Sequence, residues 1–474
     1  MIVTMKKVCL IIMTMLVSLQ IRAQSEVAKE LQADANRAAG LHYARPIGKM
    51  PKDTPAPEGK KPFYINHYGC PGSYYRETTA LYEEPYQVFA KADSLGKLTK
   101  LGHEVKHYGR HGSRYISSRK GFDIPYKMIT HAGSVNELTP TGQRVLEEMK
   151  LVMDDTEGRW GELTGYGKEQ CRAIARRMIE RFPEVLGGDA QVSSVSTIVP
   201  RCIESMGAAM MEMKQVNPRL RITMESSKRY QWYMNHQDRE LRRGYMTPEV
   251  RKAYDAYIAS RMGNSRLMEL IFKNPDIVKE IVKENDFNYY LMKMGLFQQN
   301  THLWLNTYLQ DLFQIDELYR MWQIDNALWY IQHGACKLNG GRQPYSQRFL
   351  LRQLIADADS CIRLDKPTAQ LRFGHETVLL PLVCLIGING YDLETDNLDE
   401  LEERGWWCSS IFPMASNLQF IFYRSSTKDQ DILFKVLLNE QEATLPIPTD
   451  YAPYYKWAEF RRYCLDKLSK YNKE

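Results

Sequence analysis

The chain has 474 residues, a formal net charge of +6 and 44% hydrophobic residues. This length exceeds what one hydrophobic core usually holds, so we expect two structural units. Three positive charges, on Lys6, Lys7 and Arg22, belong to a predicted leader, and without them the net charge is only +3. This charge excludes a protein that binds nucleic acid through overall basicity.

Residues 1–23 have the organisation of a secretory signal peptide. Two lysines precede an apolar run at residues 8–19, and Ala23 marks the expected cleavage site. The run is too short to span a bilayer, so we expect no integral membrane span and a periplasmic or secreted protein, with an uncleaved anchor as the alternative. Cleavage removes Cys9 and leaves eight of the nine cysteines, an even number that permits disulfides in an oxidising compartment.

The rest of the chain divides by its residue patterns. Residues 24–62 include a proline-rich stretch and predict an extended N-terminal leader. Strand and helix patterns occupy residues 63–228 and 325–474, which we expect to form an α/β core. Residues 229–324 are rich in aromatic residues, methionine and charge and have almost no strand pattern, which predicts a helical cap inserted into the core. No internal repeat is evident.

The most informative segment is residues 110–114, Arg-His-Gly-Ser-Arg, which follows a predicted strand at residues 103–108. A neutral imidazole can attack phosphorus, and guanidinium groups bind pairs of phosphoryl oxygens. Gly112 leaves room for a ligand to approach the backbone. The segment therefore predicts a phosphoryl-binding loop in which His111 is the nucleophile and Arg110 and Arg114 bind oxygens.

Two distant segments have a similar strand-to-helix organisation. Residues 193–198 predict a strand and a Ser/Thr turn, and Arg201 follows at the start of a helix. Residues 369–373 alternate like a strand, and His375 and Glu376 come directly before a long apolar helix. Ligands bind at the carboxyl ends of strands in open α/β sheets, so we expect these three side chains to lie near the loop.

Two further helices are predicted to be structural. Thr139 precedes Pro140 at one helix start, and Thr164 precedes the other, where Cys171 begins a series of apolar residues at helical spacing. We expect both helices to belong to the core.

A different chemistry is formally present at residues 103–107, His-Glu-Val-Lys-His, which match the zinc-protease pattern H-E-x-x-H. This pattern requires a helix, and here it lies between Gly102 and Gly109, which weaken one. It also gives Arg114 and His375 no role. We therefore expect no metal ion, and a zinc metalloprotease is kept as an alternative.

The three motifs together resemble the histidine phosphatase superfamily. Arg-His-Gly-x-Arg after a strand carries this resemblance, and a second histidine beside a carboxylate at residues 374–377 resembles its branch 2, the histidine acid phosphatases. The glutamate and the apolar run that follows are most similar to the multiple inositol polyphosphate phosphatases and phytases. Two departures are Ile116, where the family usually has proline, and Glu376 directly after His375, where the inositol phosphatases usually place one residue between.

The resemblance implies a fold and a reaction. The fold is a mostly parallel sheet flanked by helices, a phosphoglycerate-mutase-like core, with an inserted helical cap. In the reaction His111 is phosphorylated, Glu376 is the proton donor, and neither a metal nor a cofactor takes part. The residues expected to bind phosphate oxygens are Arg110, Arg114, Arg201 and His375, with Arg119 and Lys120 for phosphates that are not cleaved and Arg239, Arg242 and Arg243 as further candidates.

The expected partner is a small-molecule phosphomonoester, with inositol hexakisphosphate (phytate) as the leading candidate. A broad-specificity acid phosphatase is the nearest alternative. A non-catalytic protein that captures phosphorylated ligands in the same pocket is an alternative of another class. The oligomeric state, the natural substrate and the disulfide connectivity are not determined by the sequence.

Overall fold

The computed structural model describes residues 26–44, 53–69, 112–236, 238–262, 266–276, 283–305, 307–364, 366 and 368–471. Its larger sheet has the strand order β10-β8-β7-β1-β5-β2-β3, with β9 paired to β8. The strands are β1 (Lys61–Gly69), β2 (Gln191–Ser196), β3 (Arg221–Ser226), β5 (Thr368–Phe373), β7 (Asn417–Arg424), β8 (Leu433–Leu438), β9 (Gln441–Ala443) and β10 (Tyr455–Lys456), while β4 (Ala335–Cys336) and β6 (Glu394–Thr395) pair separately.

The strands β1, β5, β2 and β3 run parallel, and this part of the sheet determines where a site can form. Antiparallel strands β7 and β8 extend the sheet beyond β1. Every residue of β5, β7 and β8 is buried, as expected for strands covered on both faces. The carboxyl ends of β1, β5 and β2 therefore lie along one edge, where the loops that follow them can meet.

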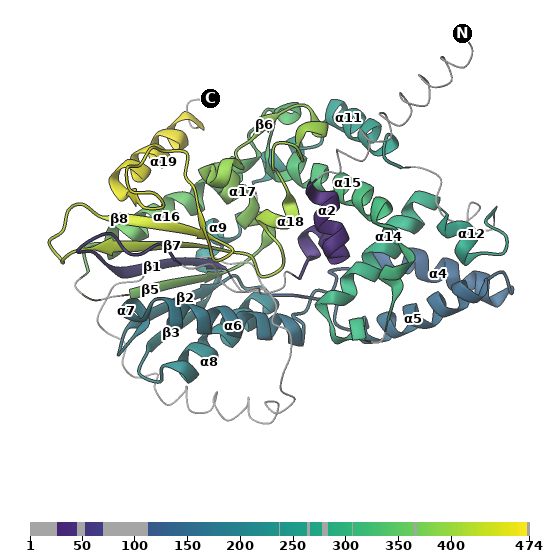
Figure 1. Cartoon of the computed structure of the whole chain (residues 1–474), viewed down its shortest axis with the longest axis horizontal. Helices are drawn as coiled ribbons and strands as arrows, with labels where there is room; N and C mark the ends of the chain where they lie inside the picture. Colours follow the sequence, from purple (N-terminus) through teal and green to yellow (C-terminus); the bar gives the residue numbers. More distant parts are fainter. Residues whose placement is uncertain are drawn as a thin grey trace, which may run out of the picture.

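Helices cover both faces of the sheet (Figure 1). Ile65 and Leu371 pack on one face with residues of α6 and α8, and Tyr64 packs on the other with residues of α16, α17 and α19. The helices of the two layers, together with the short helices α7 and α18, are α6 (Gly165–Arg181), α7 (Pro183–Leu186), α8 (Pro200–Val216), α16 (Arg348–Cys361), α17 (Glu376–Ile386), α18 (Cys408–Ile411) and α19 (Trp457–Tyr471). The predicted α/β class, with helices flanking the sheet, is confirmed.

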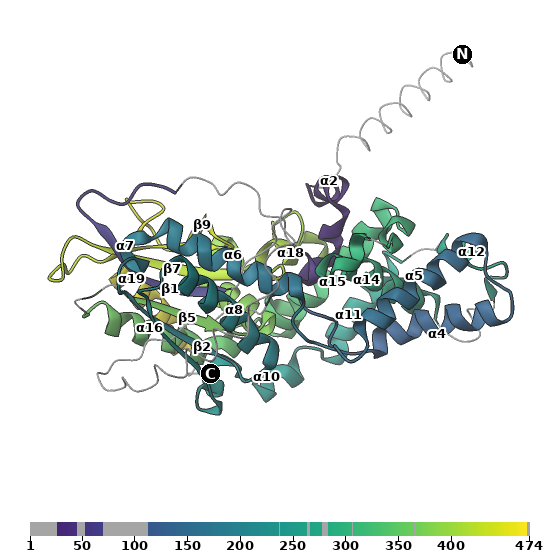
Figure 2. The ribbon, with the colours of Figure 1, turned by 90° about the horizontal axis from the view of Figure 1, so that it is seen from below.

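A second body of helices lies beyond one end of the sheet, as Figures 1 and 2 both show. One hydrophobic cluster unites Phe122, Val145, Ile271, Phe287 and Trp322, all of which are at most 1% exposed. The remaining helices are α2 (Glu26–Ala33), α4 (Lys120–Ser134), α5 (Pro140–Thr156), α9 (Gln231–Met234), α10 (Arg239–Gly244), α11 (Pro248–Ala259), α12 (Leu267–Ile271), α14 (Glu284–Phe297) and α15 (Ile315–His333). Of these, α9 packs in the same cluster as Tyr64 of the sheet. The exact limits of the leader, core and cap stay predictions.

Several predicted elements are confirmed. The strand and helix expected around Arg201 are β2 and α8, and those expected around His375 are β5 and α17. Thr139 and Thr164 cap α5 and α6 by accepting backbone hydrogen bonds from Gly142 and Gly167. The strand expected at residues 103–108 lies outside the described residues, and β1 was not predicted.

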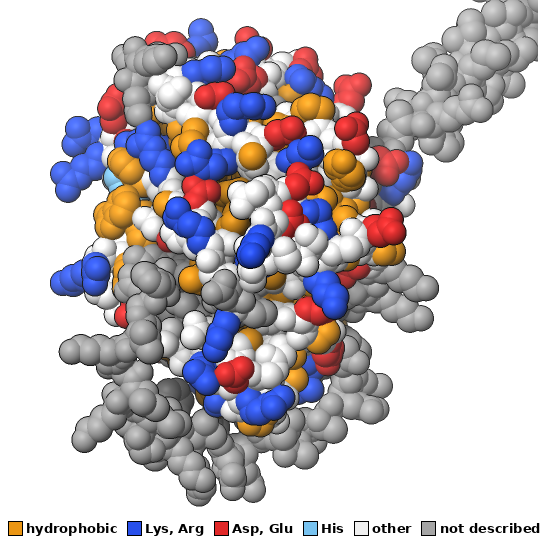
Figure 3. Space-filling model, turned by 90° about the vertical axis from the view of Figure 1, so that its left-hand side faces the viewer, with side chains coloured by type: hydrophobic (Ala, Val, Ile, Leu, Met, Phe, Trp, Pro, Cys, Tyr) orange, Lys and Arg blue, Asp and Glu red, His pale blue; other side chains and the backbone are white. Residues whose placement is uncertain are grey.

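The surface of the described residues carries both signs of charge. Figure 3 shows basic and acidic side chains interspersed over the face at one end of the sheet. Such mixing is typical of a solvated surface. Among the described residues, none of the helices is long and apolar enough to cross a membrane.

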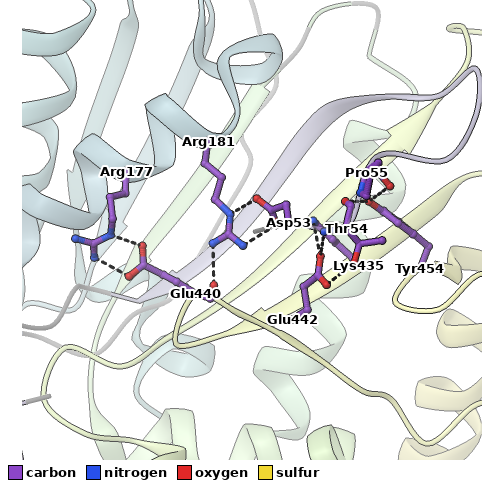
Figure 4. A network of polar contacts seen from close by, with 9 residues as sticks. All are labelled: Asp53, Thr54, Pro55, Arg177, Arg181, Lys435, Glu440, Glu442 and Tyr454. Carbon is purple, nitrogen blue, oxygen red and sulfur yellow. Dashed lines mark hydrogen bonds and ion pairs between the residues drawn. The ribbon is translucent and has the colours of Figure 1, made fainter. Parts of the chain in front are cut away.

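A polar network fastens the segment before β1 to the sheet (Figure 4). Lys435 is 1% exposed and donates to Asp53 over 2.7 Å and to Glu442 over 2.9 Å. Arg181 of α6 forms a bidentate pair with the same Asp53, and Glu442 also accepts two hydrogen bonds from Thr54. The network therefore joins the start of β1, helix α6 and the β8–β9 hairpin.

Replacing Lys435 with methionine is expected to lower the free energy of unfolding by about 3 kcal/mol, because it leaves two largely buried carboxylates short of a cation. Chemical denaturation at pH 7 measures this loss. The matched control is Arg221→Met, which removes an exposed pair with Asp189 and should change stability by no more than about 0.5 kcal/mol. A Lys435 variant as stable as the control would contradict a structural role for the network.

The pH dependence of the same loss gives a second readout. Burial alone would raise the pKa of Asp53 and of Glu442, but hydrogen bonds from Arg181 and Lys435 lower it for Asp53, and those from Lys435 and Thr54 lower it for Glu442. A depressed folded pKa contributes stability above the unfolded pKa of about 4, and this is lost as the pH falls through the folded value. The difference between wild type and Lys435→Met should therefore narrow below about pH 4.

Candidate active site

The loop between β5 and α17 presents two of the predicted site residues. β5 ends at Phe373, His375 is the N-cap of α17 in an extended conformation, and Glu376 is its first residue. Both side chains are buried, with His375 6% and Glu376 8% exposed. A carboxylate at the first turn of a helix is favoured by the positive end of the helix dipole.

The loop between β2 and α8 presents the third. β2 ends at Ser196, and α8 begins at Pro200, a residue suited to the first helical position because its missing N–H would have no partner there. Arg201 follows immediately, in the first turn of the helix. Its backbone oxygen accepts a hydrogen bond of 2.8 Å from Ser205 one turn later.

Three contacts hold these two loops together. The backbone N–H of Thr197 donates to the oxygen of Phe373 over 3.0 Å, and the Thr197 hydroxyl lies 3.2 Å from Nε2 of His375. The thiol of Cys202 donates to the oxygen of Gly374 over 3.2 Å. Burial raises the pKa of this thiol to about 12, so Cys202 stays protonated and is not a nucleophile at neutral pH.

The phosphoryl-binding loop is described from Gly112 onward. The N–H of Gly112 donates to the hydroxyl of Ser205 over 3.1 Å, and the N–H of Ser113 donates to Oε1 of Gln170 over 2.8 Å. A Cβ at Gly112 would lie 2.4 Å from the backbone oxygen of Gly167, so the position requires glycine. Helices α6 and α8 thus fix the loop beside the start of α8.

Arg114 and Glu376 form an ion pair across the site. Nη2 of Arg114 lies 3.4 Å from Oε1 of Glu376, and the two side chains are 7% and 10% exposed. Burial lowers the pKa of Arg114, the carboxylate of Glu376 opposes this shift, and the nearby charge of Arg201 adds to it. Both arginines therefore face the same small region, which Glu376 also faces.

The two arginines have unused hydrogen-bonding capacity. Among the described residues, neither Nε of Arg114 nor Nε of Arg201 has a hydrogen-bond partner, although both atoms are buried. Buried donors are normally paired, and arginine forks suit an oxyanion. This geometry suits the binding of an anion at the strand ends.

The helical body contributes His333, the last residue of α15. Its ring stacks on Trp329 with centroids 5.2 Å apart. Burial lowers the pKa of His333 to about 4, with the carboxylate of Glu376 opposing the shift and the charge of Arg242 adding to it. His333 therefore lies close enough to Glu376 and Arg242 to interact with both.

The structure brings together four of the residues predicted from the sequence: Arg114, Arg201, His375 and Glu376. Arg110 and His111 lie outside the described residues, as does the His-Glu-Val-Lys-His segment. Arg119, at the start of α4, pairs with Asp123 and Glu157, and Lys120 is the first residue of that helix. Within the described part of the chain, no group of three or more His, Cys, Asp or Glu side chains could hold a metal ion.

Sequence reasoning gave no site role to Gln170, Ser205, Thr197 or His333. One usable signal was present for Gln170, a polar residue directly before the buried apolar positions of α6. His333 carries no such signal, because its proximity to Glu376 depends on how α15 packs against α17.

Two arginines, a histidine and a carboxylate thus converge at the carboxyl ends of parallel strands in an α/β fold, an arrangement typical of a phosphatase. A family model matches residues 108–439, and the chain belongs to the histidine phosphatase superfamily (branch 2). Among curated proteins, none matches the chain significantly.

Solved structures with the same fold include the multiple inositol polyphosphate phosphatase of Bifidobacterium longum. In its complex with inositol hexasulfate it is 15% identical to this chain, with a TM-score of 0.66 over 90% of this chain and 97% of that one. Its complex with phosphate gives 16% identity and a TM-score of 0.65 over the same shares. The phytase of D. castellii is 13% identical, with a TM-score of 0.57 over 92% of this chain and 86% of that one.

Proposed function

We propose that this phosphatase hydrolyses phosphomonoesters through a phosphohistidine at His111, with inositol polyphosphates as its substrates. The observation that carries the proposal is the convergence of Arg114, Arg201, His375 and Glu376 at one edge of the sheet. The cations suit phosphoryl oxygens, and the carboxyl group suits proton transfer to a leaving group.

In the first step, a ring nitrogen of His111 attacks phosphorus and a P–N bond forms as the P–O bond to the alcohol breaks. The non-bridging oxygens are held by Arg110, Arg114, Arg201 and His375, which stabilise the charge in the transition state. Glu376, protonated at the start, gives its proton to the leaving alkoxide.

In the second step, water attacks the phosphohistidine. The carboxylate of Glu376 accepts a proton from this water as the P–N bond breaks, and inorganic phosphate leaves. Glu376 is then protonated again and His111 is neutral, so the cycle closes without a metal or cofactor. The reaction needs a protonated donor and a neutral nucleophile, and we expect an optimum at acid to near-neutral pH.

Inositol polyphosphates are proposed because charges around the pocket can hold phosphates that are not being cleaved. The charges of Arg242 of α10 and of Glu376 both act on the pKa of His333, which the first lowers and the second raises. If α10 were only a solvated helix, Asp238 at its start would pair with the arginines of that helix. Asp238 instead pairs with Arg348 of α16 over 2.6 Å. The likeness to a phosphatase solved with inositol hexasulfate supports the same choice.

A salt series is expected to separate a polyphosphate substrate from a simple one. KM for inositol hexakisphosphate should rise with added salt much more steeply than KM for a monophosphate, because several exposed charges are screened. Arg242→Gln should raise KM for the hexakisphosphate and flatten its salt dependence. The control Arg221→Gln, on the exposed strand β3, should leave both unchanged. Hydrolysis of monophosphates alone would identify a general acid phosphatase.

Two other classes of function are separated by direct tests. A protein that only binds phosphorylated ligands would give no labelled phosphoenzyme on acid quenching. A zinc metalloprotease would lose its activity on treatment with a chelator, whereas phosphate release through His111 should not change.

We also propose that the protein is exported after cleavage near Ala23. The disulfide formed by Cys171 supports an oxidising compartment. N-terminal sequencing of the mature protein from a cell envelope fraction tests the export, and a mature chain that begins at Met1 would contradict it.

A further inference from the structure

The chain contains a tandem repeat at an offset of 40 residues, which corrects the expectation that it has none. Residues 67–106 align without a gap to residues 107–146, and 14 of the 40 positions are identical. Unrelated segments of average composition share about 6%. The two copies begin His-Tyr-Gly-Cys-Pro-Gly-Ser-Tyr-Tyr and His-Tyr-Gly-Arg-His-Gly-Ser-Arg-Tyr.

The identities fall where the described second copy has the tightest structural demands. Gly112 touches the backbone at Gly167, and a Cβ at Gly142 would lie 2.2 Å from the oxygen of Ile271. Thr139 caps α5, and Ala132, Leu138 and Val145 are at most 2% exposed. Their counterparts in the first copy are the same residue types: Gly72, Gly102, Thr99, Ala92, Leu98 and Val105.

Other buried positions change residue type. Phe122, Met128 and Ile129 are at most 1% exposed, and the first copy has Tyr82, Val88 and Phe89 in their places. Asn136 has a φ of 61°, in the left-handed region, and its counterpart is Gly96, which adopts that conformation without strain. The first copy therefore retains the glycines at the loop and at the start of α5, the helix cap and several buried apolar positions. It has Leu81 and Asp93 where α4 has Gly121 and Gly133, at which a Cβ would lie 2.9 Å from Tyr290 and 3.0 Å from Leu146, so these side chains must shift.

The first copy lacks the three residues to which we assign phosphoryl binding and nucleophilic attack. Cys70, Pro71 and Tyr74 replace Arg110, His111 and Arg114. The substitutions remove the proposed nucleophile and both cations of the loop, whereas the loop glycine, the helix cap and the identical buried positions remain.

The end of β1 has the same sequence as the start of the second copy. β1 ends with His67, Tyr68 and Gly69, and the second copy begins with the same three residue types. The residues before the second copy would bury Glu104 and Lys106 where β1 has Tyr64 and Asn66, so the sheet favours residues 61–69. In the described structure the last three residues of β1 belong to the first copy, and the loop from Gly112 onward belongs to the second.

We infer that residues 67–106 are a copy, without the catalytic residues, of the unit of strand end, loop and helix at residues 107–146. The two copies compete for one position in the fold. A molecule with the first copy in that position is inactive. The second copy is favoured because its α5 continues to Met149 and Val152, both 0% exposed, whereas the first copy ends after Lys106. The catalytic part of this inference rests on the proposed function.

Two deletions of equal length test the inference. Removing residues 70–109 joins Gly69 to Arg110 and should leave a folded, active enzyme. Removing residues 107–146 joins Lys106 to Glu147, so that the first copy runs into the rest of α5, and this variant should fold but release no phosphate. Adding Cys70→Arg, Pro71→His and Tyr74→Arg to the second deletion should restore phosphate release.

Competition is measured by phosphoenzyme stoichiometry after acid quenching. The chain lacking residues 70–109 should give more phosphoenzyme per molecule than the full chain, with the same turnover rate per phosphorylated site. Equal stoichiometry would overturn the competition. Loss of the cooperative thermal transition in the chain lacking residues 107–146 would overturn the claim that the first copy can fill the position. This folding readout holds even if every variant is inactive, an outcome that would instead contradict the proposed function.

Discussion

Replacing His111 with alanine is expected to abolish turnover, lowering kcat by a factor on the order of 10⁴ or more, because alanine cannot form the P–N bond on which both steps depend. The remaining arginines would still bind the substrate. Phosphate release and acid-quench labelling measure the loss, and both signals should disappear together.

The matched control is His131→Ala, which removes an exposed histidine of α4 in the same region of the sequence. It should keep full activity, and both variants should give the circular dichroism of the wild type. A His111 variant that keeps more than a small fraction of the wild-type activity would exclude a phosphohistidine at His111.

The parts of the fold that could be predicted are those whose signal is local. The segments around Arg201 and His375 combine a strand pattern with a turn and a helix start, and the structure has β2–α8 and β5–α17 there. The caps Thr139 and Thr164 were found for the same reason, because a side-chain hydrogen bond to a backbone N–H two or three residues later is set by nearby sequence.

The strand β1 was missed because its signal is ambiguous. Phe63, Tyr64 and Ile65 form a continuous apolar run, as a strand buried on both faces requires, and such a run has no alternation to detect. The strand predicted at residues 103–108 lies outside the described residues and stays a prediction.

Contacts between distant elements were beyond the sequence. Periodicity identified the buried face of α5, but not that this face packs in one cluster with Ile271 and Phe287 of later helices. The ion pair of Arg114 with Glu376 likewise depends on how the loop after Gly112 packs against the start of α17, and the interaction of His333 with Glu376 depends on how α15 packs against α17. A single sequence gives the chemistry of these residues but not their neighbours.

Glu376→Gln is expected to slow hydrolysis of an alkyl phosphate by about 10²- to 10⁴-fold and that of an activated aryl phosphate far less. Glutamine preserves the shape and can still accept a hydrogen bond from Arg114, but it cannot deliver a proton to an alkoxide. An aryl oxide leaves without one. The exposed Glu180→Gln on α6 is the control, and neither substrate should be affected by it.

The comparison of the two substrates isolates proton transfer from the other effects of the substitution. Losing the carboxylate also leaves the buried charge of Arg114 facing Arg201 without a counterion, which should lower thermal stability and weaken both substrates alike. The ratio of the two rates cancels this common loss. If the ratio of the alkyl phosphate rate to the aryl phosphate rate is the same as in wild type, Glu376 positions Arg114 and a different carboxyl group is the donor. If this ratio falls by about 10² or more, which is the contribution of one general acid, Glu376 is the donor.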